Sequence, residues 1–269
     1  MEFKYIDEKD SRGLLNNMFI ITYKNENLPF KSKIIPTGFP SVTYIFGEKQ
    51  KAIHKDKSVN FNELIISGQF NSTYSYHVNS VAKNIGFNLY PTALYKILGT
   101  NISVFKNKLI NFKKINKELS EKFTVIFLKN EHNHINLINE SKNLINNLDL
   151  YIDRDVEKID LAIEYILEKE GMLQVIDLLK IVALSQKSLE TKFKRIIGLT
   201  PGKYIRLTRF IKLMRRYECK EIEINDLIYM YNYYDHSHFI KDFKLFMSES
   251  PKEYFKKEYP LIKAYSKDL

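Results

Sequence analysis

The chain has 269 residues, of which 42 are Lys or Arg and 32 are Asp or Glu, so its formal net charge is +10. This length favours two domains, and 44% hydrophobic against 28% charged residues is typical of globular proteins and not of disordered tails. No apolar run approaches the roughly 18 residues of a membrane-spanning helix, and no secretory signal is recognisable. We therefore expect a cytoplasmic protein without membrane association, and the basic excess suggests a polyanionic partner.

A single cysteine, Cys219, excludes an intramolecular disulfide and any zinc site that needs two thiolates. The two halves of the chain also differ in composition, because Asn is frequent up to Asn147 and only Asn225 and Asn232 follow. A boundary near residue 150 is the simplest reading of this change.

The first half predicts short strands, because runs rich in β-branched and aromatic residues alternate with turn formers. The expected strands cover 18–23, 41–46, 63–66 and 72–76, which together indicate an antiparallel sheet or barrel. Apolar residues spaced three and four apart then predict helices at 92–98, 113–127 and 133–148.

The second half predicts one helix after another. Ile159, Ile163 and Ile166 form an apolar stripe on a helix that opens at Asp153 or Asp155 and closes at Gly171. The fold class expected for the whole chain is therefore α+β, with a mainly antiparallel β part followed by an all-α part.

Residues 173–195 predict two helices joined by a tight turn at residues 183–184. Ser185 is placed to cap the second helix, on which Leu189 and Phe193 are an apolar pair four residues apart. The inward positions of the first helix are apolar as well: Val175, Leu178, Leu179 and Val182.

A second unit of the same design occupies about 224–244, with a bend at 232–233, a cap candidate at Asp235, and the pair Phe239 and Phe243. The repeat continues past each unit. The run Phe-x4-Gly-x-Thr-Pro-x2-Tyr from Phe193 to Tyr204 recurs 50 residues later as Phe-x4-Ser-x-Ser-Pro-x2-Tyr from Phe243 to Tyr254.

This doubled unit resembles the DNA-binding domain of the AraC/XylS family of bacterial transcription regulators, over about residues 157–258. The family joins its two helix-turn-helix motifs by a connecting helix, here expected at about 201–217 with Arg209-Phe210 in place of a central Arg-Leu. The sequence departs from the pattern at Asn232 and Ser248, where the family carries Gly, and at Leu179 and Ile228, where it carries a small residue.

The resemblance implies that the second helix of each unit enters the major groove of double-stranded DNA. Carried over position by position, the base-facing residues are Lys187, Glu190, Thr191, His236, Ser237 and Lys241, with Gln186 on the same outward face. These side chains suit the reading of base edges. Phosphate contact or internal pairing is expected for Lys192, Lys194, Arg195, Arg206, Arg209, Lys244 and Lys252.

Residues 15–112 resemble the cupin-like regulatory domain that precedes such a unit in some family members, through segments 35–46, 67–69 and 85–99. The resemblance implies a regulatory and dimerisation domain at 1–150, a DNA-binding domain at 151–260 and a tail at 261–269. Its implied partners are DNA, RNA polymerase, a second copy of the chain and a small-molecule effector in the barrel mouth. The candidate pairing helix is Asn139 to Leu148.

Other functions have less support. His132 and His134, like His236 and His238, are two apart without a carboxylate or thiolate cluster, so no metal site is expected. No nucleophile elbow, phosphate loop or His-Glu-x-x-His helix occurs, so we expect neither an enzyme nor a cofactor. The alternatives are a β-barrel enzyme or small-molecule-binding domain tethered to DNA, and a ligand-free DNA-binding scaffold.

Overall fold

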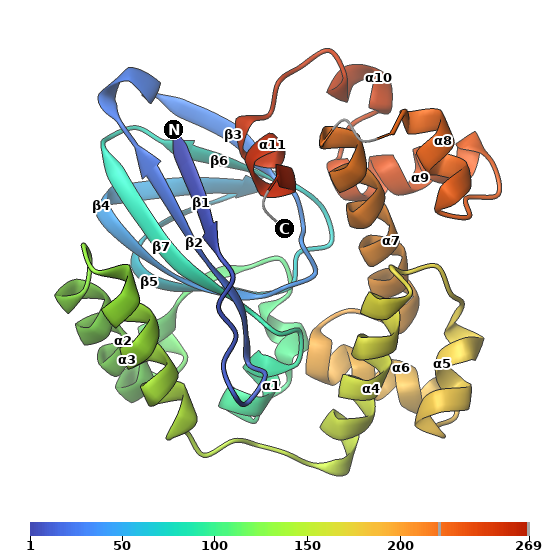
Figure 1. Cartoon of the computed structure of the whole chain (residues 1–269), viewed down its shortest axis with the longest axis horizontal. Coiled ribbons are helices and arrows are strands. Elements are labelled where there is room, and N and C mark those ends of the chain that lie inside the picture. The colour runs from blue at the N-terminus through green and yellow to red at the C-terminus, as the bar shows by residue number, and fades with distance from the viewer. Residues whose placement is uncertain (220–221, 268–269) are drawn as a thin grey trace.

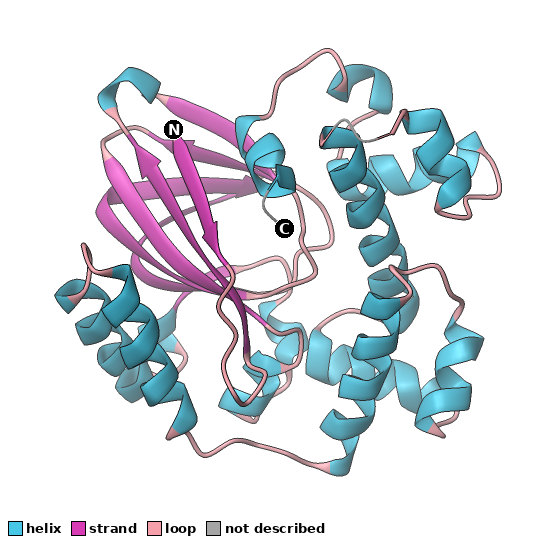
Figure 2. Ribbon diagram, in the orientation of Figure 1, coloured by secondary structure: helices cyan, strands magenta, loops and turns pink. Residues whose placement is uncertain are grey.

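The computed structural model of the chain describes residues 1–219 and 222–267. Figure 1 shows a twisted sheet built by the N-terminal part, with α2 and α3 on one side and α4 to α10 on the other. Figure 2 shows the same division by secondary structure, since all strands lie in the sheet and the second half is helical. The predicted α+β fold class is therefore confirmed.

The sheet contains eight antiparallel strands. Its main path runs β1-β2-β7-β4-β5-β8, and β3 pairs with β6, which also pairs with β4. The strands are β1 (Glu2–Ile6), β2 (Leu15–Tyr23), β3 (Phe30–Ile34), β4 (Ser41–His54), β5 (Lys57–Ser67), β6 (Tyr74–Val78), β7 (Ala82–Leu89) and β8 (Leu109–Asn111). The sheet is not closed, so of the two forms that the sequence left open, an antiparallel sheet and a barrel, the structure has the open sheet.

Both faces of the sheet are covered, as strand β2 shows. Met18 and Ile20 lie in a buried cluster shared with the helices, whereas Phe19, Ile21 and Tyr23 lie in a second cluster on the opposite face. Side chains alternate between the faces of a strand, so this division follows from the period of two. The run Met-Phe-Ile-Ile is accordingly apolar without a break.

The strand β7 at the centre of the sheet was not predicted. It pairs with both β2 and β4, although its sequence contains Asn84, Gly86 and Asn88. A Cβ at Gly86 would lie 2.6 Å from the Phe19 ring, so glycine is required there by close packing. Asn84 is buried, exchanges hydrogen bonds with Gln50 and donates a hydrogen bond to the Tyr76 hydroxyl.

The helices that follow the sheet begin slightly later than predicted. The predicted helix at 113–127 is a 3₁₀ turn, η3 (Phe112–Lys114), and then α2 (Lys117–Lys129), which the Asn116 side chain caps. The other N-terminal helical elements are η1 (Asn25–Asn27), α1 (Ala93–Leu98), η2 (Ile102–Phe105) and α3 (His134–Asn146).

The second half contains α4 (Arg154–Glu168), α5 (Val175–Val182), α6 (Gln186–Ile197), α7 (Pro201–Glu218), α8 (Ile224–Met230), α9 (His236–Met247), α10 (Pro251–Tyr254) and α11 (Pro260–Lys267). Asp153, one of the two predicted caps of α4, accepts the N–H of Val156 at 2.8 Å. Most of the expected tail forms α11, where Leu261 and Ile262 are buried. Among the described residues, no helix has the length and apolar character needed to cross a bilayer.

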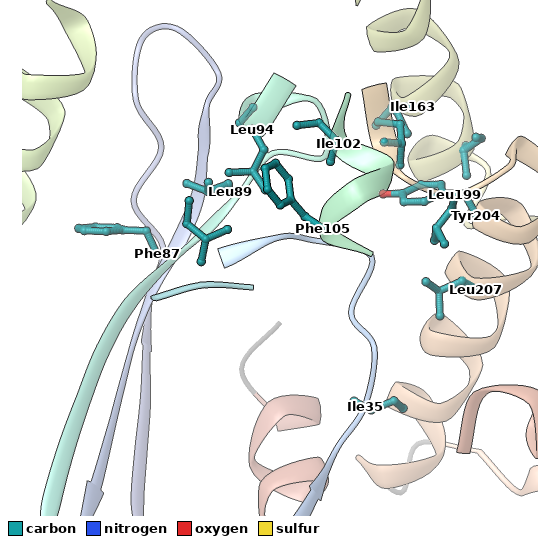
Figure 3. Close-up of a cluster of buried hydrophobic side chains, with 14 of the residues drawn as sticks. Ile35, Phe87, Leu89, Leu94, Ile102, Phe105, Ile163, Leu199, Tyr204 and Leu207 are labelled. Atoms are coloured by element: carbon teal, nitrogen blue, oxygen red, sulfur yellow. The ribbon is translucent and has the colours of Figure 1, made fainter. Parts of the chain in front are cut away.

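One buried cluster joins the two halves of the molecule. Figure 3 shows Leu89, Leu94, Ile102 and Phe105 of the N-terminal half packed toward Ile163, Leu199, Tyr204 and Leu207 of the helical half. The Tyr204 hydroxyl donates to the Gly38 carbonyl at 3.1 Å, which adds a polar tie across the same contact. The helical half is therefore held against the sheet domain by a continuous apolar core.

Candidate nucleic-acid interface

The first helix-turn-helix unit, α5 and α6, has the geometry that its sequence predicts. Ala183 forms the turn with φ 49°, in the left-handed region, and Ser185 Oγ accepts the N–H of Ser188 at 3.3 Å. Leu189 and Phe193 are fully buried on the inner side of α6. The cap, the turn and the apolar pair are therefore confirmed.

The second unit, α8 and α9, repeats this geometry. Asn232 adopts φ 55° at the turn, which Asn tolerates better than most residues with a side chain. Asp235 Oδ1 accepts the N–H of His238 at 2.8 Å, and Phe239 and Phe243 are buried. The two outer helices, 186–197 and 236–247, differ by 50 at both ends, so the repeat in the sequence is a repeat in the structure.

The connecting helix α7 holds both outer helices on one core. The Tyr204 ring lies 5.7 Å from Phe193 of α6, and the Phe210 ring lies 5.6 Å from Phe243 of α9, between ring centroids. Phe210 also packs against Phe246 at 5.2 Å. Because aromatic pairs at these separations are well packed, α7 fixes the separation of the two units.

The outward faces of α6 and α9 are open to solvent. Five base-facing candidates have exposed side chains: Lys187, Glu190, Thr191, Ser237 and Lys241. His236 is exposed as well, with its ring 6.2 Å from that of Tyr229. Gln186 Nε2 donates to Glu190 Oε1 at 3.0 Å, so these two side chains are already oriented on one face. Contact of these residues with DNA stays a prediction.

The arginines assigned to phosphate or internal pairing make internal contacts. Arg206 and Arg209 of α7 converge on the buried carboxylate of Asp242, and the Arg209 guanidinium lies 4.5 Å from the centre of the Tyr233 ring. Burial, and then the charge of Asp242, raise the pKa of Tyr233, so its hydroxyl stays protonated. Of the three arginines, only Arg195 lies outside this cluster.

Arg195 and Lys192 of α6 hold the start of α4. Arg195 lies 2.9 Å from an Asp155 oxygen and 5.2 Å from the centre of the Tyr95 ring, and Lys192 lies 2.7 Å from Asp155. Lys194 and Lys244 are exposed on the outer helices. A phosphate role for these residues stays a prediction.

The family resemblance implies a core or interface role for His238, at a position where the family usually carries an aromatic packing residue, but this side chain is not in the core. Its side chain is 54% exposed, and Nδ1 lies 3.1 Å from Asp235 Oδ1. The reason is local, because α9 starts at His236 and its inward positions are taken by Phe239 and Phe243. In residues 1–219 and 222–267 no three His, Cys, Asp or Glu side chains gather where they could hold a metal ion.

Contacts between the second unit and the sheet were not predicted. Thr73 donates its N–H to the Phe246 carbonyl at 2.7 Å and its hydroxyl to the Met247 carbonyl at 2.8 Å. Lys33 of β3 lies 2.7 Å from Glu249. These contacts join residues far apart in the chain, and no local pattern signals them.

A cavity of about 390 Å³ lies between the sheet domain and α7. Phe39, Tyr204 and Ile211 give it apolar walls, and Lys9 and Lys212 add ammonium groups. The effector pocket was expected in a barrel mouth, and this cavity lies instead beside the connecting helix.

The family comparisons agree with this geometry. Residues 178–257 match the model of a helix-turn-helix domain. This part of the chain is an AraC-type helix-turn-helix domain. Residues 13–111 match a model described as a domain of unknown function, DUF6597. No similar sequence was found among curated proteins.

Several solved structures resemble the chain. A single-residue variant of apo ToxT from Vibrio cholerae strain SCE256 is 14% identical, with 93% of this chain and 99% of that one covered and a TM-score of 0.49. ToxT from Vibrio cholerae O395 bound to (E)-4-(8-methylnaphthalen-1-yl)but-3-enoic acid is 14% identical, with 95% of this chain and 99% of that one covered and a TM-score of 0.49. The AraC-like transcriptional activator CuxR is 11% identical, with 80% of this chain and 86% of that one covered and a TM-score of 0.30.

Proposed function

We propose that the chain is an AraC-type transcriptional regulator that reads a DNA site with α6 and α9. The observation that carries the proposal is the repeated geometry of the AraC-type domain: two capped outer helices, each with an exposed polar face, mounted on α7. A helix presented in this way fits the major groove, and two helices on one rod read successive segments of an asymmetric site.

The side-chain chemistry divides the interface into two parts. Lys187, Glu190 and Thr191 on α6, with His236, Ser237 and Lys241 on α9, are free to meet base edges. Lys194 and Lys244, one turn further along their helices, are placed for phosphates. Arg206 and Arg209 act within the protein, where they hold Asp242 and so orient α9 on α7.

The test is the ratio of affinities for specific and random DNA. A duplex obtained by in vitro selection should bind about 10³ times more tightly than a random duplex at physiological salt. Lys187→Ala and Lys241→Ala should each weaken the selected complex by about 1–3 kcal/mol and the random one much less. Lys114→Ala, an exposed change in the sheet domain, is the control. Equal losses on both duplexes would reassign Lys187 and Lys241 to phosphates.

The 390 Å³ cavity supports control by an effector, since its volume lies within the range of small-molecule sites. Apolar walls with three cationic side chains, Lys9, Lys212 and Arg215, against one carboxylate, Asp7, favour an apolar molecule that carries a carboxylate. Such a ligand would contact the sheet domain and α7 together, and could therefore change the placement of the AraC-type domain.

A dansyl-labelled undecanoate is a direct probe of this cavity. Its fluorescence should rise on binding, its neutral methyl ester should bind more weakly, and Lys212→Ala should weaken the acid but not the ester. Lys114→Ala again serves as the control. Equal affinity for the acid and the ester in all three proteins would remove the carboxylate from the proposal.

The proposed regulator would have two protein partners, a second copy of the chain and RNA polymerase. Val125, Leu128 and Ile135 on α2 and α3 are exposed apolar residues, which supports pairing of two copies through these helices. Within the segment expected to pair, Ile145 is buried inside its own chain, so the pairing surface moves toward α2. Sedimentation of the wild-type chain and of Val125→Lys tests the dimer, and RNA polymerase remains the partner implied by the family.

A further inference from the structure

A turn of the sheet domain lies directly against the outer helix of the first unit. The 3₁₀ turn η2 packs on α6, with Ile102 and Phe105 buried. At the end of α6, a Cβ on Gly198 would lie 3.4 Å from the Ile102 carbonyl oxygen. Figure 3 shows Ile102 and Phe105 beside Leu199 and Tyr204, where α6 ends and α7 begins. The sheet domain therefore reaches the edge of the first DNA-reading unit.

Four lysines lie at or beside this contact. The sheet-domain pair is placed by their neighbours, because His54, which precedes Lys55, and Asn107, which follows Lys106, line one cavity. Lys106 directly follows η2, Lys194 lies in the last turn of α6, Lys203 lies in the first turn of α7, and Lys55 lies in the turn between β4 and β5. Lys106 is half-buried and the other three are exposed. Burial lowers the pKa of Lys106, and the charges of Lys203, Lys55 and Lys194 lower it further.

The four lysines have no ion-pair partner among the described residues: none of them pairs with a carboxylate in residues 1–219 and 222–267. Asp56, next to Lys55 in its turn, has an exposed side chain. Ammonium groups brought together in this way repel one another, so an external anion would stabilise the arrangement.

The position of the cluster indicates which anion this is. Two of its lysines belong to the AraC-type domain and two to the sheet domain, and Lys194 lies on α6, the helix proposed to read DNA. Because three of the four lysines are exposed, the backbone phosphates of a duplex bound by α6 are suitable anions for them.

We propose that Lys55 and Lys106 of the sheet domain bind phosphates of the same duplex that α6 reads, so that the sheet domain is part of the DNA interface. This inference rests on the proposed function. It predicts that bound DNA bridges the two domains and holds them in the arrangement seen here, which a free AraC-type domain could not reproduce.

The salt dependence of DNA binding tests the proposal. For B-DNA, log K falls with log[salt] by about 0.9 for each phosphate contacted. Lys55→Ala/Lys106→Ala in the full chain should therefore lower this slope by about 2, and should weaken the selected and the random duplex by the same factor. The probes are duplexes of about 30 base pairs, which cover two half-sites one helical turn apart.

The matched control is Lys117→Ala/Lys122→Ala, which removes the same charge from α2, away from the helices that read DNA (Figure 1). Its slope should equal that of the wild type, and Lys55→Arg/Lys106→Arg should also keep the wild-type slope. An unchanged slope in Lys55→Ala/Lys106→Ala, or an equal change in the α2 control, would overturn the inference while leaving the proposed function standing. A wild-type chain that binds neither duplex would overturn both.

Discussion

Asp242 on α9 is a carboxylate with almost no contact with solvent. Its side chain is 3% exposed, and Arg206, Arg209 and Tyr233 surround it. A buried charge is tolerated only when it is paired and hydrogen-bonded. Since the arginines belong to α7 and Asp242 to α9, this cluster fixes the second outer helix on the connecting helix.

Asp242→Ala should destabilise the protein by about 3 kcal/mol, at the low end of the range for broken buried pairs, because both arginines keep some access to water. Urea unfolding followed by circular dichroism measures this loss. Glu190→Ala, an exposed carboxylate on α6, is the control and should change stability by less than about 0.5 kcal/mol. A similar small effect for Asp242→Ala would mean that the cluster contributes nothing to stability.

Residues that act locally could be predicted, and residues that act across the chain could not. Ser185, Asp235 and Asp153 each cap a helix that begins at the next residue, so their roles can be predicted from the few residues that follow them. Asp242 meets arginines more than thirty residues earlier, a pairing that depends on how α7 and α9 are packed. His238 was misassigned for the same reason, since exposure is decided by packing.

At the scale of the helix, Asp153 contributes a charge as well as a cap. Burial alone would raise the pKa of Asp153, but hydrogen bonds from the Val156 N–H and the Tyr95 hydroxyl, with the charge of Arg195, lower it overall. A carboxyl whose pKa is lower in the folded state stabilises that state above its unfolded pKa of about 4. This stabilisation is lost as the pH falls through the folded pKa.

Asp153→Ala should therefore cost about 1 kcal/mol at neutral pH, as expected for a lost cap, and distinctly less at about pH 2.5. Denaturant titrations of both proteins across this pH range measure the difference. Ser185→Ala removes a cap that carries no charge, so its cost should not depend on pH. Parallel pH curves for the two variants would contradict the assignment of the charge.

The ends of α6 and α9 show a second effect at this scale. Gly198 ends α6 with φ 90°, whereas Ser248 ends α9 with φ 56°, a left-handed conformation that costs a residue with a side chain about 1 kcal/mol. Ser248→Gly should raise the free energy of unfolding, by up to about 1 kcal/mol. Thermal unfolding checks this, with Gly198→Ser as the reciprocal variant that should destabilise. A loss of stability in Ser248→Gly would contradict the backbone argument.

Strongly periodic elements were predictable, and elements that depend on neighbours were not. The apolar stripes of α4, α5, α6, α8 and α9 predicted these helices to within one turn at their ends, because one face of each is buried, whereas α7 was expected from the family resemblance. Strand β7 was missed because Asn84, Gly86 and Asn88 have low strand propensity. Their places in β7 depend on contacts with the neighbouring strands. Strands β1 and β3 are short, and their pairing partners lie elsewhere in the chain.

For the whole molecule, the decisive contacts are those that join the halves. The resemblance placed a regulatory domain before a DNA-binding domain, but nothing in the sequence predicted that Thr73 would bind the end of α9 or that η2 would pack on α6. Together with the cluster of Figure 3, these contacts fix both outer helices relative to the sheet. Under the proposed function, an effector in the 390 Å³ cavity would change DNA binding by rearranging this contact between the halves.

Helix α11 closes this contact from the C-terminal side. It packs against β3 and α7, and its first two apolar residues divide between the two cores: Leu261 enters the cluster of Phe30 and Tyr74 on the sheet, and Ile262 enters the cluster shared with α7. Helix α11 thus joins the connecting helix α7 to strand β3. Its burial explains why these residues are apolar in a segment that we expected to be a tail.

Leu261→Ala should cost about 3 kcal/mol of unfolding free energy, because it removes a fully buried side chain from the sheet cluster and leaves a cavity. The loss should appear in a probe of the sheet, such as amide exchange of β3, although the substitution lies beyond the AraC-type domain. Lys263→Ala, an exposed change on the same helix, is the control and should alter stability by less than about 0.5 kcal/mol. If exchange in β3 is equally slow in both variants, α11 does not support the sheet, and the two halves are joined by the cluster around Tyr204 and by the contacts of Thr73 and Lys33.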